Sequence, residues 1–318
     1  MKKKILYLEC PQFASLPSQT QLLSISTEFD CTFLNSVPDS LNEIAKLKNI
    51  DIFVSNTASF DLFNSLRKNH PSCSNILVTE LAMAEYSENL NDTEEDLIDH
   101  IISSRQIDNW TCNEIRVTIH KEIGDDIFGI EKYLAANTTI HEEIVSSNFD
   151  RERLNQKVFD YAKSCHLGQH LSRMAFGICE ELLMNTVYDA PLAAGISRFK
   201  NIDQTQEVEL LPEEQGLLRY GCDGRILAIS TQDPFGALKK ETLLKYLKKV
   251  LKRSSTEDLI DTKASGAGLG FFKILYSSHG IVCNVSPKKK TEIMALIHVN
   301  EHLRDFSVMP RSIHFFDC

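Results

Sequence analysis

Short apolar runs alternate with segments of helical spacing along residues 1–120. The apolar runs are residues 5–8, 31–34, 52–54 and 76–78, and each has the length of a buried strand. Helices are predicted between and after them, at residues 19–29, 40–47, 62–68 and 94–102. Alternating strands and helices favour a parallel sheet that is covered by helices on both faces.

Residues 142–300 show a different order of elements. A strand is predicted at residues 142–147 and a helix at 151–165, followed by a helix with an apolar stripe. Further strands are predicted at 225–230 and 293–297, with an amphipathic helix between them at 239–253. The apolar stripe consists of Leu171, Ala175, Ile178 and Leu182. The two patterns, like the length of 318 residues, predict an α/β protein of two domains.

A connector and a tail complete the predicted organisation. Residues 113–136 have a helical pattern, from which we predict a helical connector over 121–141. Gly124 and Gly129 weaken this helical pattern. It would join a domain at 1–120 to a domain at 142–300, and residues 301–318 would form a tail. Residues 311–316 are apolar, which predicts either a final strand or a segment packed on a neighbouring domain.

Composition narrows the class of protein. A hydrophobic share of 42% suffices for globular cores, and no apolar run reaches the roughly 20 residues of a membrane span. The basic start is followed only by the short run 5–8, which is too short for a signal peptide. Nine cysteines without a Cys-x-x-Cys pair indicate reduced thiols and no zinc knuckle. A net charge of −10 and the lack of a nucleic-acid motif argue against nucleic acid. We therefore expect a cytoplasmic protein that binds neither membrane nor nucleic acid.

Polar side chains recur every four residues in the second helix of the 142–300 region, at Glu181, Asn185 and Asp189. On an α-helix this spacing places them along one face. Carboxylate and amide oxygens suit Mg²⁺, which keeps several of its waters. A solvated helix face is the commoner cause of such spacing, so the interpretation depends on the motifs that follow. His166 and His170 have a metal-ligand spacing, but the intervening Gly168 favours a loop.

Three later motifs carry further candidate chemistry. The strand at 225–230 runs into the turn Asp233-Pro234-Phe235-Gly236. A glycine loop opens the short helix at 271–275, and Lys290-Thr291-Glu292 precedes the last strand. Glycines allow close backbone approach, and N–H groups at a helix start attract phosphate. The glycines of the loop are Gly266, Gly268 and Gly270.

The joint order of these motifs resembles the GHKL ATPase superfamily, which includes histidine kinases, DNA gyrase, a heat-shock chaperone and the MutL repair proteins. Within it, residues 142–300 most resemble the anti-sigma-factor serine kinases. The resemblance implies an α/β sandwich with a mixed sheet that binds ATP and Mg²⁺. It implies that Glu181 is the general base, that Asn185 ligates Mg²⁺ and that Asp233 accepts a hydrogen bond from the adenine amino group. The remaining implied binding residues are Asp189 one turn after the N box, Gly236 in the first glycine box, Gly266, Gly268 and Gly270 in the lid, and Thr291 beside the adenine.

The first glycine box departs from the family pattern Asp-x-Gly-x-Gly. Phe235 and Ala237 stand at its two glycine positions, and Gly236 lies one place off. Pro234 and Phe235 stiffen a loop that normally flexes around the base. The sequence therefore favours nucleotide binding over nucleotide turnover.

Residues 1–120 resemble the receiver domain of two-component signalling, which has a flavodoxin-like fold. Thr79 matches its switch hydroxyl, but Glu9 is followed by Cys10 where a receiver has an acidic pair. Ser55 stands at the phosphoacceptor position, and the lysine after the fifth strand is missing near 107–112. Without an aspartate nucleophile there is no phosphoryl acceptor. The resemblance therefore implies a degenerate receiver that acts in docking or dimerisation.

Two functional hypotheses follow. In the first, a bacterial signal-transduction protein binds Mg²⁺·ATP and phosphorylates a serine or threonine of a partner signalling protein, of the sigma or anti-anti-sigma kind or another regulator. In the second, the protein is a non-catalytic switch or a nucleotide-free interaction module. A conformational hydrolase ranks last, and a homodimer is left open. The cationic face of the helix at 239–253 has three readings: a solvated face, an acidic-partner surface or a lid cation.

Overall fold

The protein forms two compact units, which are described separately. A computed structural model describes residues 2–11, 28–82, 98–104, 110–124, 126–200, 202, 206–251, 269–300 and 309–318. The first unit comprises Met1–Ile127 with Phe306–His314, and the second comprises Phe128–Asp305 with Phe315–Cys318. Strand pairs are parallel in one part of the chain and antiparallel in another, so the fold class is mixed α/β, as predicted.

The first unit contains a parallel sheet with the strand order β2-β1-β3-β4-β5. Helices cover both of its faces: Ile44 and Phe63 lie in the core on one face, and Ile115 and Ile119 in the core on the other. The four strands predicted from apolar runs are confirmed, as are the helices predicted at 40–47 and 62–68. The elements are β1 (Lys4–Leu8), β2 (Asp30–Leu34), α2 (Val37–Lys46), β3 (Ile52–Ser55), α3 (Phe60–Asn69), β4 (Ser74–Thr79), β5 (His100–Ser103) and α5 (Trp110–Ile123).

One sequence prediction for this unit is wrong. Residues 100–102, the end of the helix expected at 94–102, belong instead to strand β5, whose residue His100 pairs with Ile76 of β4. The region near 107–112, where the receiver lysine is missing, includes Trp110 at the start of α5. His100 hid the strand because a histidine breaks the apolar run, yet it is buried against Glu122 at 3.0 Å. The helix predicted at 19–29 lies almost wholly outside the described residues.

The apolar tail contains a strand, β11 (Ser312–Asp317). A final strand was one of the two alternatives predicted for residues 311–316. In the first unit it pairs antiparallel with β5 through Ile313 and His314. Glu114 of α5, which is fully buried, accepts hydrogen bonds from the Ser312 hydroxyl at 3.0 Å and from His314 Nε2 at 3.1 Å. Burial lowers the pKa of His314, which favours the neutral ring. A polar lock therefore holds the start of β11 in this unit.

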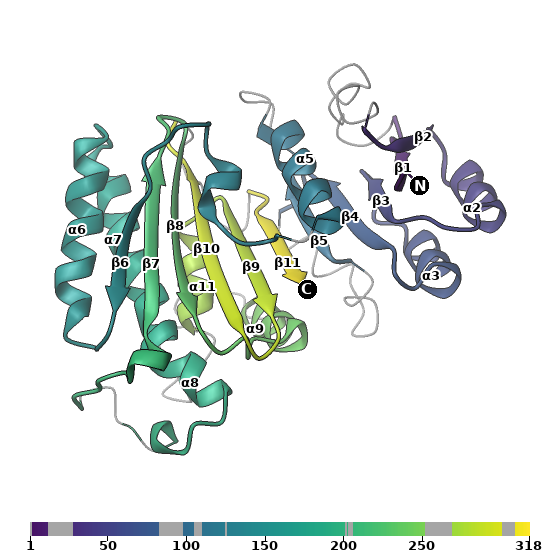
Figure 1. Ribbon diagram of the computed structural model, residues 1–318. Coiled ribbons are helices and arrows are strands. Elements are labelled where there is room, and N and C mark those ends of the chain that lie inside the picture. The colour runs from purple at the N-terminus through teal and green to yellow at the C-terminus, as the bar shows by residue number, and fades with distance from the viewer. Residues whose placement is uncertain are drawn as a thin grey trace. The chain divides into compact units, whose positions relative to one another are not determined.

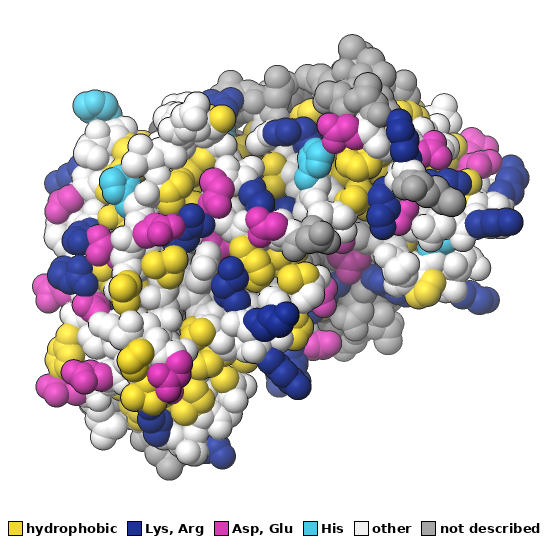
Figure 2. Space-filling view, viewed as in Figure 1, with side chains coloured by type: hydrophobic (Ala, Val, Ile, Leu, Met, Phe, Trp, Pro, Cys, Tyr) yellow, Lys and Arg dark blue, Asp and Glu magenta, His cyan; other side chains and the backbone are white. Residues whose placement is uncertain are grey.

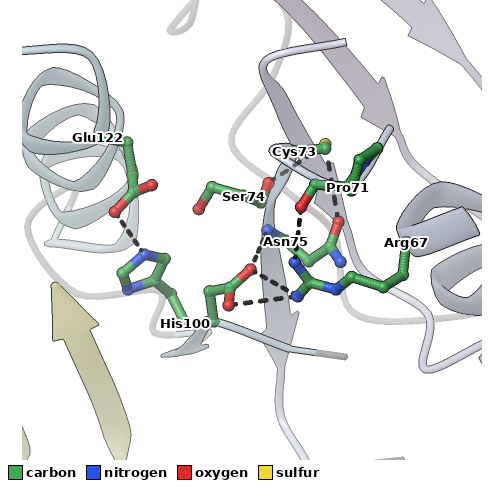
Figure 3. Close-up of polar contacts among 8 residues, drawn as sticks. Arg67, Pro71, Cys73, Ser74, Asn75, His100 and Glu122 are labelled. Atoms are coloured by element: carbon green, nitrogen blue, oxygen red, sulfur yellow. Dashed lines mark hydrogen bonds and ion pairs between the residues drawn. The ribbon is translucent and has the colours of Figure 1, made fainter. Parts of the chain in front are cut away.

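Further carboxylates of the first unit are also matched to basic groups. Figure 3 shows the His100 ring and the Glu122 carboxylate pointing toward each other. Asp99 accepts from the Arg67 guanidinium at 3.3 Å and from the backbone N–H of Asn75 at 2.9 Å. Burial alone would raise the pKa of Glu122, but the charge and hydrogen bond of His100 hold it below its usual range.

The second unit contains five strands in the order β9-β10-β8-β7-β6, with antiparallel neighbours (Figure 1). Helices cover one face of this sheet, since Thr231 of β8 donates to the carbonyl of Leu182 in α7 at 3.3 Å. A short 3₁₀ turn, η2, lies on the other face, where Arg219 of β7 pairs with Glu131 at 2.9 Å. The elements are η2 (Ile130–Tyr133), β6 (His141–Val145), α6 (Asp150–Ser164), α7 (Gln169–Met184), η3 (Asn185–Asp189), α8 (Ala190–Ala193), β7 (Gly216–Cys222), β8 (Ile226–Asp233), α9 (Lys240–Leu251), α11 (Leu269–Tyr276), β9 (Gly280–Ser286) and β10 (Lys290–His298).

Most predicted elements of residues 142–300 are confirmed, but β7 and β9 were not predicted from the sequence. The helical pattern over 113–136 is only partly realised, because α5 ends at Ile123. Gly129 adopts a φ of 102°, which ends any helix there and leads into η2. His166 has a φ of 60° in the turn between α6 and α7, so the predicted loop at His166 is confirmed.

Strand β6 carries charged pairs on both of its faces. Glu142 pairs with Arg219 of β7 on the face opposite the helices, whereas Glu143 pairs with Lys157 of α6. Figure 2 shows acidic and basic side chains interspersed with hydrophobic ones on the face in view. Among the described residues, no helix is long and apolar enough to cross a membrane.

Candidate functional site

The helix that carries Glu181 changes its geometry just after that residue. Helix α7 ends at Met184, and residues Asn185–Asp189 form a π-helical turn in which the N–H of Ala190 bonds the carbonyl of Asn185. Pro191 follows and has no N–H to donate; in a regular helix its ring would collide with the carbonyl of Val187. Asn185 therefore follows Glu181 by one α-helical turn, whereas the step from Asn185 to Asp189 runs through a π-helical turn.

Packing beneath the π turn explains how the sheet accommodates it. The buried Thr186 hydroxyl donates to the carbonyl of Leu182 at 3.0 Å. A Cβ placed on Gly216 of β7 would lie 2.3 Å from the Thr186 methyl group. Gly216 thus makes room for Thr186, so the turn packs closely against the sheet. Such π turns occur often at functional sites.

Asp233 and Thr291 lie directly opposite each other at neighbouring strand ends. They pair in the register of β8 and β10, on the face that carries α7, because Thr231 of β8 points the same way as Asp233. Both residues are buried, with 8% and 2% exposure. The Asp233 carboxylate accepts the N–H of Phe235 at 2.9 Å. Desolvation raises the pKa of Asp233 to about 6, although hydrogen bonds from Phe235, Thr291 and Gly236 oppose the rise.

Gly236 serves a fixed turn rather than a flexible loop. Its φ is 58°, and its carbonyl accepts the N–H of Lys288 at 3.2 Å in the turn between β9 and β10. A Cβ at this position would lie 2.1 Å from the carbonyl oxygen of Ser286. Only glycine fits here, so the single glycine of the first box fastens the segment after Asp233 to the hairpin.

Glu181 faces the start of helix α11. Its carboxylate pairs with Lys273 at 2.6 Å, and a Cβ on Gly270 would lie 2.6 Å from Oε2 of Glu181. Sequence reasoning missed Lys273. The sequence feature that could have indicated Lys273 is its spacing of three residues from Gly270, which places both residues on the same face of a helix.

Asp189 forms part of the same acidic neighbourhood as Glu181. The residue as a whole is exposed, although its carboxyl group is desolvated by the protein around it. Desolvation raises the pKa of Asp189 to about 6, and the charge of Glu181 adds to the rise. Raised carboxyl pKa values mark positions where a cation or a hydrogen-bond donor is favoured.

The predicted site residues thus fall into two groups. Glu181, Asp189 and Gly270 lie around the end of α7, whereas Asp233, Gly236 and Thr291 lie at the strand ends. Leu182 ties the helix to the sheet face of the second group, because its carbonyl accepts from Thr231. Asn185 is half-buried at the first position of the π turn. Gly266 and Gly268 lie outside the described residues.

Metal ligation by protein groups alone is limited here. Within the ranges that the structure describes, no group of three His, Cys, Asp or Glu side chains could hold a metal ion. An Mg²⁺ ion at this site would need further oxygen ligands from water or phosphate, which is its usual habit.

Comparisons with known proteins leave the family open. No family model matches the chain, and no curated protein matches it. A solved structure of S. aureus homoserine dehydrogenase at pH 7.0 is 11% identical, over 95% of this chain and 94% of that chain, with a TM-score of 0.22. Agreement at that level carries no argument about fold or activity.

Proposed function

We propose that the second unit binds Mg²⁺·ATP in a GHKL-type pocket and belongs to a bacterial signal-transduction protein. The observation that carries the proposal is the buried Asp233–Thr291 pair, which sits at two adjacent strand ends on the same sheet face as α7. A five-stranded antiparallel sheet with helices α6, α7, α9 and α11 on one face is the setting in which the motif residues occur. The proposed cellular location is the cytoplasm.

The chemistry of the donor set fits the proposed ligand. Asp233 is a desolvated carboxylate with a raised pKa, and an amino group donating to it would offset the lost hydration. Thr291 adds a buried hydroxyl beside it. Asn185 would supply an amide oxygen to Mg²⁺, which neutralises phosphate charge when bound. Gly270 would let the start of α11 approach the phosphates closely.

Phosphoryl transfer is the less supported half of the proposal. A general base must be able to accept a proton from the attacking hydroxyl, whereas Glu181 is engaged by Lys273 at 2.6 Å. This ion pair favours a second candidate function, in which nucleotide binding orders the lid and changes partner binding without transfer. In the catalytic version, Lys273 must leave Glu181 before a serine or threonine of the partner protein reacts.

We further propose that the first unit is a degenerate receiver that docks a signalling partner or a second copy. Its strand order, β2-β1-β3-β4-β5, is that of flavodoxin-like folds. At the end of β3, the buried Ser55 hydroxyl donates to the carbonyl of Thr57 at 3.0 Å and accepts its N–H. That position holds a satisfied hydroxyl rather than a carboxylate nucleophile, which supports a docking role.

Calorimetric titration of ATP, with and without Mg²⁺, tests the binding proposal. Wild type should bind with micromolar affinity in Mg²⁺, and Asn185→Ala should lose at least about tenfold of it. Gln156→Ala, an exposed change on α6, is the matched control and should bind like wild type. Wild-type protein that binds no ATP would refute the proposal, and an unchanged Asn185→Ala affinity would refute the metal role.

Turnover assays separate the two candidate functions. Without the partner protein, water takes the place of the attacking hydroxyl, so transfer is read as slow phosphate release. Under the catalytic hypothesis, Glu181→Gln keeps ATP affinity but removes this release, while Lys273→Met frees Glu181 and raises the release rate. Under the switch hypothesis, all three proteins bind ATP and none releases phosphate above background. Turnover that survives Glu181→Gln would assign the base to another residue.

A further inference from the structure

Glu292 is a fully buried carboxylate on the sheet face opposite the proposed nucleotide pocket. It follows Thr291 on β10, and successive side chains of a strand point to opposite faces. Its oxygens accept four hydrogen bonds: from the Gly129 N–H at 2.8 Å, the Ser230 hydroxyl at 3.1 Å, the Gln232 amide at 3.0 Å and the Asn284 amide at 2.8 Å. All four donors are neutral.

No basic side chain within the described ranges forms an ion pair with Glu292. A buried carboxylate is costly unless hydrogen bonds replace its hydration. Here those bonds come from the two neighbouring strands, β8 and β9, and from the segment that precedes η2. The Glu292 carboxylate therefore favours one arrangement of its four donors. If any donor moves away, the negative charge of the carboxylate is less well compensated.

The partner outside the sheet is Gly129, at the start of the segment that leads from the first unit into the second. This segment lies on the open sheet face, where Glu131 pairs with Arg219 and the N–H of Ala135 donates to Asp223 at 2.9 Å. Those two contacts are exposed, whereas the contact of Gly129 with Glu292 is buried. Glu292 is thus a buried polar anchor of the segment 128–135, beside its buried apolar residues Ile130 and Tyr133.

The strand register connects this anchor to the pocket. Gln232 pairs with Glu292, and the next rung pairs Asp233 with Thr291. One rung faces the linking segment and the adjacent rung faces the helices. A shift of β8 against β10 would therefore change both faces together.

We propose that Glu292 is a positioning residue that couples the nucleotide pocket to the segment 128–135. The coupling rests on the proposed function, whereas the anchoring of the segment does not. A nucleotide that holds Asp233 and Thr291 in register strengthens the anchor, and a docked segment raises nucleotide affinity by the same factor. The segment then reports pocket occupancy along the chain toward the first unit.

Hydrogen exchange of the full-length protein tests the anchor without any ligand. Glu292→Gln keeps the shape but replaces one acceptor oxygen with an N–H₂ group amid four donors. Amides of residues 129–133 should exchange about tenfold faster or more than in wild type. Glu142→Gln, an exposed carboxylate that also bonds Arg219, is the control and should leave Gly129 unchanged. Unchanged exchange at Gly129 in folded Glu292→Gln overturns the anchor.

ATP titration of the same proteins tests the coupling. Glu292→Gln should bind ATP several-fold more weakly, and ATP should slow segment exchange in wild type but not in the variant. Gly129→Ala provides a second route, because the φ of 102° strains any other residue there and so displaces the segment without touching either strand. It should lower ATP affinity in the same direction.

The outcomes separate this inference from the proposed function. If both variants bind ATP as tightly as wild type while the segment exchanges faster, the coupling is overturned. The proposal of ATP binding is not affected by this outcome. A wild-type protein that binds no ATP overturns the proposed function and the coupling together, while the exchange rate at Gly129 alone decides the anchor. Should Glu292→Gln fail to fold, Gly129→Ala carries both tests.

Discussion

One buried carboxylate of the first unit and two carboxylates of the second unit have pKa values shifted in opposite directions. In the first unit, Glu122 pairs with His100, and its pKa lies below the usual range. In the second unit, neither Asp233 nor Asp189 forms an ion pair with a described residue, and the pKa of each is raised to about 6. Paired carboxylates stabilise a fold, whereas desolvated carboxylates without a cation are poised to receive one. The difference separates a carboxylate that faces a basic side chain from two carboxylates that face none among the described residues.

The first and largest test removes a paired carboxylate. Glu114→Ala leaves the Ser312 hydroxyl and the His314 ring buried without their acceptor, so the free energy of unfolding should fall by about 3–5 kcal/mol. Urea unfolding measures this loss. Glu43→Ala, which breaks the surface pair with Lys46, should cost under about 1 kcal/mol. A Glu114→Ala loss no larger than that of Glu43→Ala would contradict a structural role for the lock.

The second test concerns the backbone that positions Asp233. Gly236→Ala should lower the free energy of unfolding by about 3 kcal/mol, because left-handed strain adds to a clash with Ser286. Gly195→Ala is the matched control: its φ is 82°, but nothing lies within 4 Å of the added Cβ. It should cost about 1 kcal/mol. Equal losses in the two variants would mean that the hairpin simply moves aside.

The third test uses pH. The folded pKa of Asp233, about 6, exceeds an unfolded value near 3.9, so the folded state binds more protons between these values. The stability from this group is therefore complete below about pH 4 and is lost as pH rises through 6. The loss should amount to about 2–3 kcal/mol. Asp233→Asn should gain that amount relative to wild type between pH 4 and pH 7 in urea unfolding. Parallel pH profiles for the two proteins would contradict the raised pKa.

The smallest effect is expected at the receiver-like position. Ser55→Ala removes a hydroxyl that bonds only Thr57 among the described residues, and should cost about 1 kcal/mol in urea unfolding. ATP affinity should stay at the wild-type value, because Ser55 belongs to the other unit. Acetyl phosphate should likewise leave residues 1–120 of wild type without stable label, as intact-mass measurement would record. Stable labelling there would restore a phosphoacceptor to the first unit.

Local pattern was sufficient to predict most helices and strands but not their chemistry. Strands such as β3 and β4 were predictable because β-branched residues cluster between polar segments. Strand β5 was not, since His100 is buried only by virtue of Glu122, 22 residues later. Strand β7 escaped prediction because Arg219 and two glycines interrupt its apolar run.

The sequence was a better guide to which residues form the candidate site than to how these residues are arranged in space. Asp233 and Thr291 are opposite each other through strand register, which motif order implied only through resemblance. The pairing of Lys273 with Glu181 spans 92 residues and depends on the packing of α11 on α7, so no local spacing reveals it. The four-residue spacing from Asn185 to Asp189 did not reveal the π-helical turn there, although Pro191 was visible in the sequence.

The π turn at Asn185–Asp189 also has a consequence for chain length. A π turn spans one more residue than the α-helical turn it replaces, so this segment behaves as a helix with a single-residue insertion. A residue that follows the turn therefore occupies the helix position that the preceding residue would occupy in an uninterrupted α-helix. A deletion of one residue from this turn would rotate Asp189 away from its present direction and place Pro191 in the register of a regular helix, where its ring collides with the preceding turn. Insertions and deletions, rather than substitutions, are thus the changes to which this end of α7 is most sensitive.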